Sequence, residues 1–266
     1  MNKKRWLILA VVMVVVGSIL FGGVMMTQKW NFFVLQTEKS ETNRYEIQEE
    51  YANISININT ANLVILPTEE DSTTVECFER EKIKHTVQVK DDTLVIDVVD
   101  SRKWYEHIEI FFQSPKITVY MPQKQYAAVS VKASTADMQI EKLSANHLDI
   151  TLSTGDMRLT DVQCKNVSGT VSTGDIHLEY VIVAQELAMQ SSTGDIFLEG
   201  CDANRLKIRT STGDVKGWLL SPKGFIAKTN TGKVNVAQTT AGGLCEITTE
   251  TGDIDVDVLL MHVTTP

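Results

Sequence analysis

Apolar and polar residues alternate with a period of two through most of the chain beyond residue 128, and the alternation shifts phase at regular intervals. In one segment Leu148, Ile150 and Leu152 are apolar, and the residues between them are polar. Such alternation is typical of a β-strand with one buried face. After a short polar phrase the apolar positions resume at Met157 and Leu159, out of phase with the first set. The chain must therefore bend at the phrase, so that two short strands direct their apolar side chains toward one interior.

The polar phrase, Ser-Thr-Gly-Asp in its commonest form, recurs every 19 or 20 residues. Its copies begin at Ser134, Ser153, Ser172, Ser192, Ser211, Asn230 and Glu250. An outlying copy, Asn59-Thr60-Ala61-Asn62, begins 75 residues before Ser134. A fixed period of this length indicates one supersecondary unit stacked on copies of itself. The phrase contains glycines that can adopt positive φ in a bend, and we predict a structural turn role for Gly155, Gly174, Gly194, Gly213, Gly232 and Gly252.

A repeat with two short strands and two bends fits two architectures. In a β-solenoid each repeat is one coil, and equivalent strands stack in parallel about 4.8 Å apart. In an antiparallel meander or sandwich each repeat is a hairpin, whose turn more often contains Asn-Gly or Asp-Gly. The return of the same residue type to the same position favours stacked coils. We therefore expect an all-β fold, a repetitive β-solenoid with a period of 19–20 residues, and keep the antiparallel meander or sandwich as the alternative.

Aspartates occupy the last position of five copies of the phrase: Asp137, Asp156, Asp175, Asp195 and Asp214. Stacking would place their carboxylates about 5 Å apart, where like charges favour a bridging cation such as calcium. The other interpretation is that each carboxylate accepts backbone N–H groups of its own bend. Lys233 interrupts the series before Asp253. We prefer the structural interpretation and predict no metal site, with a cation-binding edge as the alternative.

The repeat is lost between residues 67 and 125, but the pattern there is still that of β-strands. Alternating apolar residues on both sides of Asp91-Asp92 predict a hairpin, and Ile117, Val119 and Met121 predict a further strand that ends at Pro122. Because the exposed end of a stack needs a cover, we expect residues 49–128 to form an irregular β-rich cap and residues 129–262 to form the repeat stack.

The amino terminus predicts a membrane segment. Lys3, Lys4 and Arg5 precede an uncharged apolar run of 22 residues, 6–27, which as a helix would span roughly 33 Å, against about 30 Å for a hydrocarbon core. We expect a cytoplasmic stub at 1–5, a single transmembrane helix at 6–27 and a tether at 28–48, with the bulk of the chain outside the cell. The alternative is a cleaved signal peptide followed by secretion.

Charge and motif content exclude several function classes. The net charge is −9; without the three basic residues of the leader it is 22 − 34 = −12, which argues against nucleic acid as a partner. No GxSxG, HExxH, phosphate-loop or EF-hand pattern occurs, so no catalytic residue and no cofactor are predicted. The five histidines are scattered and are expected on the surface. The four cysteines form no CxxC pair, and their phase predicts buried free thiols.

These repeats, with the strand before Pro67 and the Tyr120-Met121-Pro122 strand end, resemble the bacterial adhesin-like family of β-strand-repeat domains that includes the membrane-anchored LiaG-like proteins. The resemblance covers roughly residues 44–260. It implies a repetitive β-fold at the cell envelope, links some members to envelope-stress operons, and implies no catalytic residues.

We therefore expect a non-enzymatic surface module whose partner is an envelope protein, a wall polymer or another copy. The alternatives are an accessory protein of an envelope-stress response and a polysaccharide-acting enzyme. Trp104, Tyr105 and Trp218 are the aromatic side chains expected either on a binding face or packed at the cap or an outer bend.

Overall fold

The computed structural model describes residues 3–27, 29–30, 40–102, 114–239 and 242–259. The chain is mostly β, with one apolar helix, α1 (Lys3–Thr27), near its amino terminus. Residues 6–27 of α1 are long and apolar enough to cross a membrane, which fits either a single-pass anchor or a signal sequence. The strands belong to a separate compact unit made of residues 40–101 and 114–266.

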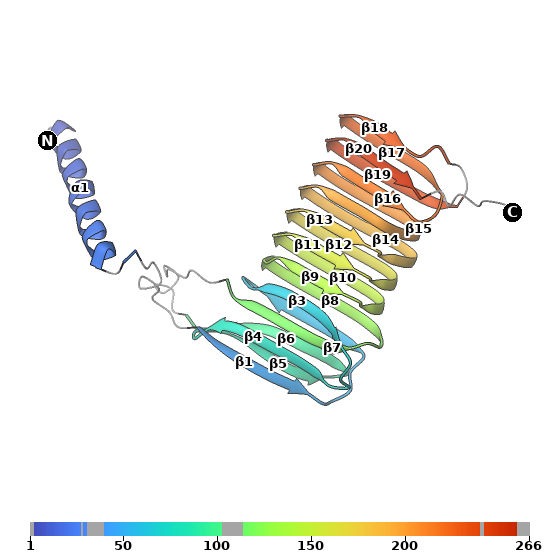
Figure 1. The fold of residues 1–266 in the computed structure, drawn as a ribbon, viewed down its shortest axis with the longest axis horizontal. Coiled ribbons are helices and arrows are strands. Elements are labelled where there is room, and N and C mark those ends of the chain that lie inside the picture. The colour runs from blue at the N-terminus through green and yellow to red at the C-terminus, as the bar shows by residue number, and fades with distance from the viewer. Residues whose placement is uncertain (1–2, 28, 31–39, 103–113, 240–241, 260–266) are drawn as a thin grey trace. The chain divides into compact units, whose positions relative to one another are not determined.

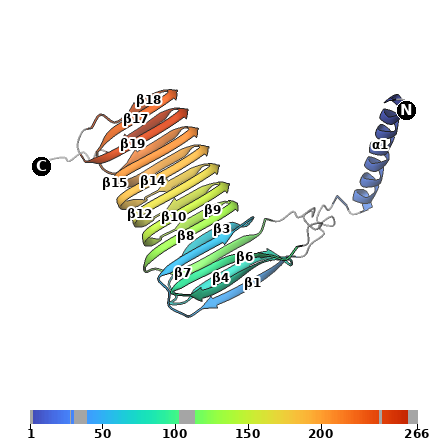
Figure 2. The same cartoon turned by 180° about the vertical axis from the view of Figure 1, so that it is seen from behind.

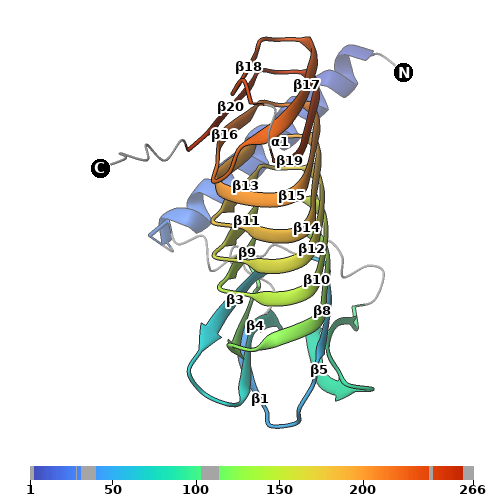
Figure 3. The same ribbon diagram turned by 90° about the vertical axis from the view of Figure 1, so that its right-hand side faces the viewer.

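The repeats stack in parallel and form two layers joined by bends (Figure 3). The first layer contains, in spatial order, β8 (Gln125–Thr135), β10 (Ser144–Thr154), β12 (Gln163–Thr173), β14 (Ile182–Thr193), the second half of β15 (Ile196–Thr212), β19 (Gly243–Thr251) and β17 (Lys223–Thr231). The second layer contains β9 (Met138–Glu141), β11 (Met157–Thr160), β13 (Ile176–Glu179), the first half of β15, β16 (Val215–Leu219), β20 (Ile254–Val258) and β18 (Val234–Val236). One strand from each layer, with the bend between them, is called a rung.

As the alternation in the sequence predicted, the apolar residues point inward, and they lie between the two layers. Leu148 aligns with Val129 on one side and Val167 on the other, and all three are buried. In the second layer Met157 aligns with Met138 and Ile176, also buried. Equivalent residues of neighbouring repeats thus pair in parallel, whereas hairpin repeats would pair antiparallel.

The glycine of the phrase makes the bend possible. Gly174 has a φ of +143°, and a Cβ atom there would lie 2.1 Å from the carbonyl oxygen of Gly155 in the preceding rung. Five further phrase glycines, Gly155, Gly194, Gly213, Gly232 and Gly252, also have positive φ and the same close approach to a backbone oxygen. Only a residue without a side chain allows neighbouring bends to stack this closely.

The last two rungs are exchanged relative to the order of the sequence (Figure 1). β19 pairs with β15 on one side and with β17 on the other, and β20 likewise lies between β16 and β18. The expectation that Lys233 interrupts the aspartates before Asp253 is therefore wrong, because Asp253 follows Asp214 directly in the stack. The chain passes over one rung position after β16, forms β17 and β18, and then returns to fill the gap.

A similar insertion occurs at the other end of the stack (Figure 2). The outlying copy of the phrase joins β2 (Asn53–Ile58) to β3 (Asn62–Thr68). β2 pairs in parallel with β6 (Thr93–Asp100) and β8, while β3 pairs with β7 (Lys116–Pro122) and β9. The connection from β7 to β8 therefore passes over the rung that β2 and β3 form.

Antiparallel strands complete this end. β4 (Thr73–Arg80) pairs with both β7 and β1 (Ser40–Ile47), and β5 (Ile83–Lys90) pairs with β6. The hairpin predicted at Asp91-Asp92 is confirmed: both residues have positive φ, of 48° and 59°. Residues 40–47, which the sequence placed in a tether at 28–48, instead form β1, because their alternating side chains find a partner strand in β4.

Candidate functional site

The aspartates of the phrase form a continuous series of hydrogen bonds along one edge of the stack, called here the aspartate ladder. In each case Oδ1 of one aspartate accepts the backbone N–H of the equivalent residue in the next rung. The N···O distances are 3.2 Å for Asp156 on Asp137, 2.9 Å for Asp175 on Asp156, 2.8 Å for Asp195 on Asp175, 2.7 Å for Asp214 on Asp195 and 2.7 Å for Asp253 on Asp214. Each carboxylate thus accepts a hydrogen bond from the next bend along the stack, whereas the interpretation from the sequence placed this hydrogen bond within the carboxylate's own bend.

The two ends of the aspartate ladder explain the copies that depart from the phrase. Asn62 begins it, because its Oδ1 accepts the N–H of Asp137 at 3.1 Å as a carboxylate would. Lys233 ends it: its N–H donates to Oδ1 of Asp253 at 2.7 Å, and no described rung follows that would need an acceptor from its side chain. The lysine in the phrase therefore marks the outer rung, which the sequence alone did not reveal.

One oxygen of each of these carboxylates is engaged by the stack itself. At Asp214 the second oxygen also has a partner, because Lys216 Nζ donates to Oδ2 at 2.6 Å. This bond, followed by the N–H of Asp253, lowers the pKa of Asp214 from its ordinary value. The ladder therefore aligns neighbouring rungs, and the cation-binding edge formed by Asp137, Asp156, Asp175, Asp195 and Asp214 stays a prediction.

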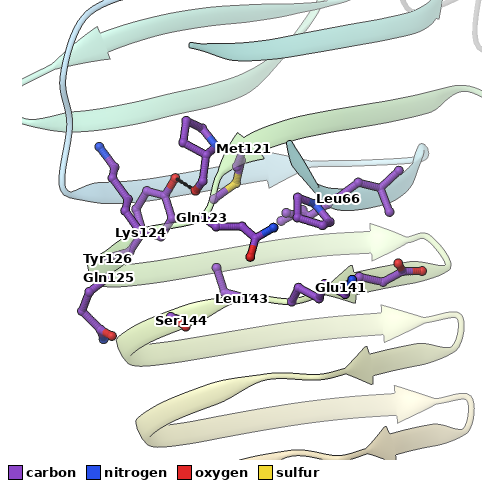
Figure 4. Close-up of a pocket in the computed structure, with 13 residues that line it drawn as sticks. Leu66, Met121, Gln123, Lys124, Gln125, Tyr126, Glu141, Leu143 and Ser144 are labelled. Atoms are coloured by element: carbon purple, nitrogen blue, oxygen red, sulfur yellow. Dashed lines mark hydrogen bonds between the residues drawn. The ribbon is translucent and has the colours of Figure 1, made fainter. Parts of the chain in front are cut away.

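A shallow depression of about 330 Å³ lies where the chain passes over the β2–β3 rung (Figure 4). β3 leaves the stack after Thr68, and the turn from β7 to β8 spans its position, so a gap opens above the next bend at residues 141–144. Lys124, on this turn, places Nζ 4.9 Å from the ring centre of Tyr51 and 5.4 Å from that of Tyr126. Glu141, Lys142 and neutral amides also line the depression, so it has a mixed polar surface without a dominant charge.

Aromatic side chains gather on the outward surface of the second layer and form what we call the aromatic patch: His177, Tyr180, Phe197 and Trp218. The rings of His177 and Phe197 stack with their centroids 4.6 Å apart, and Tyr180 meets Trp218 edge-on at 6.2 Å. Gly200 makes room for the second pair, because a Cβ atom there would lie 2.8 Å from the Tyr180 ring and 3.0 Å from Trp218. Tyr180 remains 46% exposed.

Of the aromatic residues that the sequence singled out, only Trp218 can be placed; Trp104 and Tyr105 lie outside the described residues. Tyr180, which meets Trp218, and Phe197, which stacks on His177, were missed. Phe197 aligns with His177 of the preceding repeat and Lys216 of the next, so the period could have identified its outward position.

The cysteines and one histidine are deeply buried. Cys77, Cys164, Cys201 and Cys245 are free thiols inside the unit, as the sequence predicted. Burial raises the pKa of each thiol, to about 12 for Cys77, Cys201 and Cys245 and about 11 for Cys164. The prediction of a surface position is wrong for His85, which is 4% exposed and lies against Glu79. His107 and His262 lie outside the described residues.

Comparison with known proteins gives a family but distant structures. The family model described as Toastrack DUF4097 matches residues 51–259. No curated protein matches the sequence. Similar solved structures include a candidate lipid-binding protein from Parabacteroides distasonis (14% identity, TM-score 0.48, covering 84% of this chain and 98% of that one) and a candidate adhesin from Bacteroides fragilis (16%, 0.44, 83% and 97%). A candidate cell adhesion protein from Clostridium sporogenes is also similar (10%, 0.40, 84% and 100%).

Proposed function

We propose that this chain, which belongs to the Toastrack DUF4097 family, is a membrane-anchored, adhesin-like module that binds a component of the bacterial cell envelope. In this proposal residues 1–5 stay in the cytoplasm, residues 6–27 of α1 cross the membrane and the β unit lies outside. The three basic residues at the start of α1, Lys3, Lys4 and Arg5, and the 22-residue apolar run that follows them support this orientation. The parallel stack is then a β-solenoid that presents a long regular surface, with residues 49–128 covering its first end.

The aromatic patch is the observation that carries the proposed binding role. Residues 129–258 contain four Phe, Tyr or Trp residues, and three of them, Tyr180, Phe197 and Trp218, lie together in this patch. The interior of the stack is filled by aliphatic side chains at equivalent positions, so these outward rings are not needed to build the core. Clustered aromatic side chains on an outer surface are characteristic of binding surfaces, because they bury a large area on contact.

The patch supports binding rather than catalysis. Its rings contact one another and the backbone of Gly200, so their edges and polar ring atoms are available to a partner. The flanking charged residues Glu199 and Lys216 are exposed, and so they suit the polar rim of an interface. The motifs of the common hydrolases are missing from the sequence.

Site-specific photo-crosslinking in intact cells tests this proposal. A crosslinking residue at Lys216, which aligns with Phe197 in the patch, should yield a defined product. The same residue at Thr170, exposed on the other layer, should not. Replacing Tyr180 and Trp218 together by Ser should reduce the product by about tenfold or more, as loss of central aromatic contacts does. Equal products from both positions, or a product unchanged by the double substitution, would refute the patch as the binding surface.

The membrane anchor is tested separately. Protease added to intact cells should degrade the β unit and leave α1 with the membrane fraction. Recovery of the chain, shortened at its amino terminus, from the culture medium would instead support a cleaved signal sequence.

A further inference from the structure

Three side chains of different metal-binding chemistry converge inside the β unit, away from the aromatic patch. Cys77 and Glu79 lie two residues apart on β4 and so face the same side of that strand. His85 reaches them from β5, the next strand along the chain. The Sγ, carboxylate and ring-nitrogen atoms of these three residues all lie within 4.8 Å of one another.

The cluster is enclosed. Cys77 and Glu79 are both 0% exposed, and His85 is 4% exposed. His85 Nδ1 lies 2.7 Å from Glu79 Oε2, which also accepts the backbone N–H of His85 at 2.7 Å. Because burying an ionisable carboxylate and a histidine is costly unless they are well paired, this arrangement calls for a physical reason.

Glu79 is oriented by a second group, as a metal-binding carboxylate usually is. Asn43 on β1 donates its side-chain amide to Glu79 Oε1 at 2.7 Å and to Glu41 Oε1 at 2.9 Å. Glu79 Oε1 is thereby fixed on the side of Asn43, and Oε2 points toward His85. Outer-sphere hydrogen bonds of this kind orient ligands and strengthen metal binding.

We propose that Cys77, Glu79 and His85 form a zinc-binding site, with Cys77 Sγ, His85 Nδ1 and Glu79 Oε2 as three ligands. Thiolate, imidazole and carboxylate are the ligand types that zinc takes in proteins. The thiolate and the carboxylate together neutralise the two charges of the ion, so the occupied site buries no net charge. Binding releases the thiol proton of Cys77 and requires His85 to bind through an Nδ1 that carries no proton.

His85 and Glu79 need only a small movement to accommodate the ion. With zinc–nitrogen and zinc–oxygen bonds of about 2.0–2.1 Å in a tetrahedron, the two ligand atoms lie roughly 3.3 Å apart. His85 Nδ1 and Glu79 Oε2 must therefore separate from 2.7 Å by well under 1 Å, which a rotation of either side chain provides. Burial and the nearby Glu79 raise the pKa of the Cys77 thiol to about 12, so the thiol is protonated without the ion and becomes a thiolate on binding it.

The other buried cysteines provide the contrast. Among the described residues, the cluster around Cys77 is the one group of three Cys, His, Asp or Glu side chains close enough to share an ion. Cys164 and Cys245 align with the aliphatic residues of neighbouring rungs and fill the core in the same way. They serve as control positions, because they are also buried thiols.

Metal binding by the detergent-solubilised full-length chain tests the site. After treatment with a chelator, the wild-type chain should take up one Zn²⁺ per molecule in equilibrium dialysis. With Co²⁺ as a spectroscopic probe it should show the intense near-ultraviolet thiolate-to-cobalt charge-transfer band. Cys77→Val should abolish the band and the stoichiometric zinc binding, whereas Cys164→Val should keep both. Asn43→Ala should weaken zinc affinity roughly 10- to 100-fold.

Folding of each variant is checked by far-ultraviolet circular dichroism, and Val is chosen at position 77 because its size is similar to that of cysteine. If Cys77→Val does not fold, His85→Gln provides the second variant, and it should likewise lose stoichiometric zinc. A wild-type chain that binds no zinc at micromolar concentration would overturn the proposal and leave a buried Glu79–His85 pair. Retention of the cobalt band in Cys77→Val would overturn it as well.

Discussion

The aspartate ladder makes a quantitative prediction about the stability of the stack. In Asp175→Ala, the backbone N–H of Asp195 loses the carboxylate oxygen that it contacts at 2.8 Å. A hydrogen bond to a charged group contributes about 1.5–3 kcal/mol, and partial exposure of the edge lets water replace some of it, so we expect a loss of about 1–2 kcal/mol. The bond joins two rungs, so its removal loosens the contact between them.

Two controls separate the hydrogen bond from the charge. Asp175→Asn keeps an oxygen at the same position, as Asn62 does naturally toward Asp137, and should cost less than about 0.5–1 kcal/mol. Lys233→Ala should cost almost nothing, because the Lys233 side chain accepts no bond from a following rung.

The assay is urea unfolding followed by circular dichroism. With a urea dependence of about 2–3 kcal/mol per molar, the Asp175→Ala midpoint should fall by roughly 0.5 M. The reasoning fails if Asp175→Ala unfolds at the wild-type midpoint, or if Asp175→Asn is as destabilised as Asp175→Ala. Repeating the series with millimolar calcium tests the cation-binding edge, since a bound ion would raise the wild-type midpoint more than that of either variant.

Three further predictions follow from the bends and the rung order. Gly194→Ala places a Cβ atom 2.0 Å from the Gly174 oxygen at a φ of +143°; it should destabilise the chain by about 3 kcal/mol or more, which the same urea assay measures. The pKa of Asp214 is lowered from its ordinary value of 3.8 by its bond to Lys216. This carboxylate therefore stabilises the fold fully above pH 3.8, and progressively less as the pH falls through the lowered pKa. Asp214→Asn should show a weaker acid dependence of the unfolding midpoint between about pH 4 and 2. Deleting residues 243–266 removes the strands with which β17 and β18 pair; limited proteolysis should then also degrade β17 and β18, and their resistance would contradict the rung order.

The sequence predicted the shape of a single rung well and the order of the rungs poorly. Period and phase identified the buried positions, such as Leu148 and Met157, because a strand with one buried face has to alternate. They also identified Asn59–Asn62 as a copy of the phrase, and its rung stacks directly on the first repeat. Equivalent repeats are interchangeable partners in a stack, however, so similarity alone does not say which copy follows which.

The proposed zinc site of Cys77, Glu79 and His85 could not be predicted from the sequence, for a different reason. Its ligands come from two strands of the irregular part of the chain, with spacings that match no metal-binding motif. His85 looked like a surface histidine, because its neighbours in the sequence, Lys84 and Thr86, are polar. Only the placement of β5 against β4 shows that its side chain turns inward.

The exchange of the last two rungs has a consequence for biogenesis. A chain is synthesised from its amino terminus, and its early parts begin to fold before the later ones emerge. β17 and β18 nevertheless have no partner strands among the described residues except β19 and β20, which are made after them. This end of the stack can therefore form only after β19 and β20 have been synthesised, whereas the rungs before them have their partners earlier.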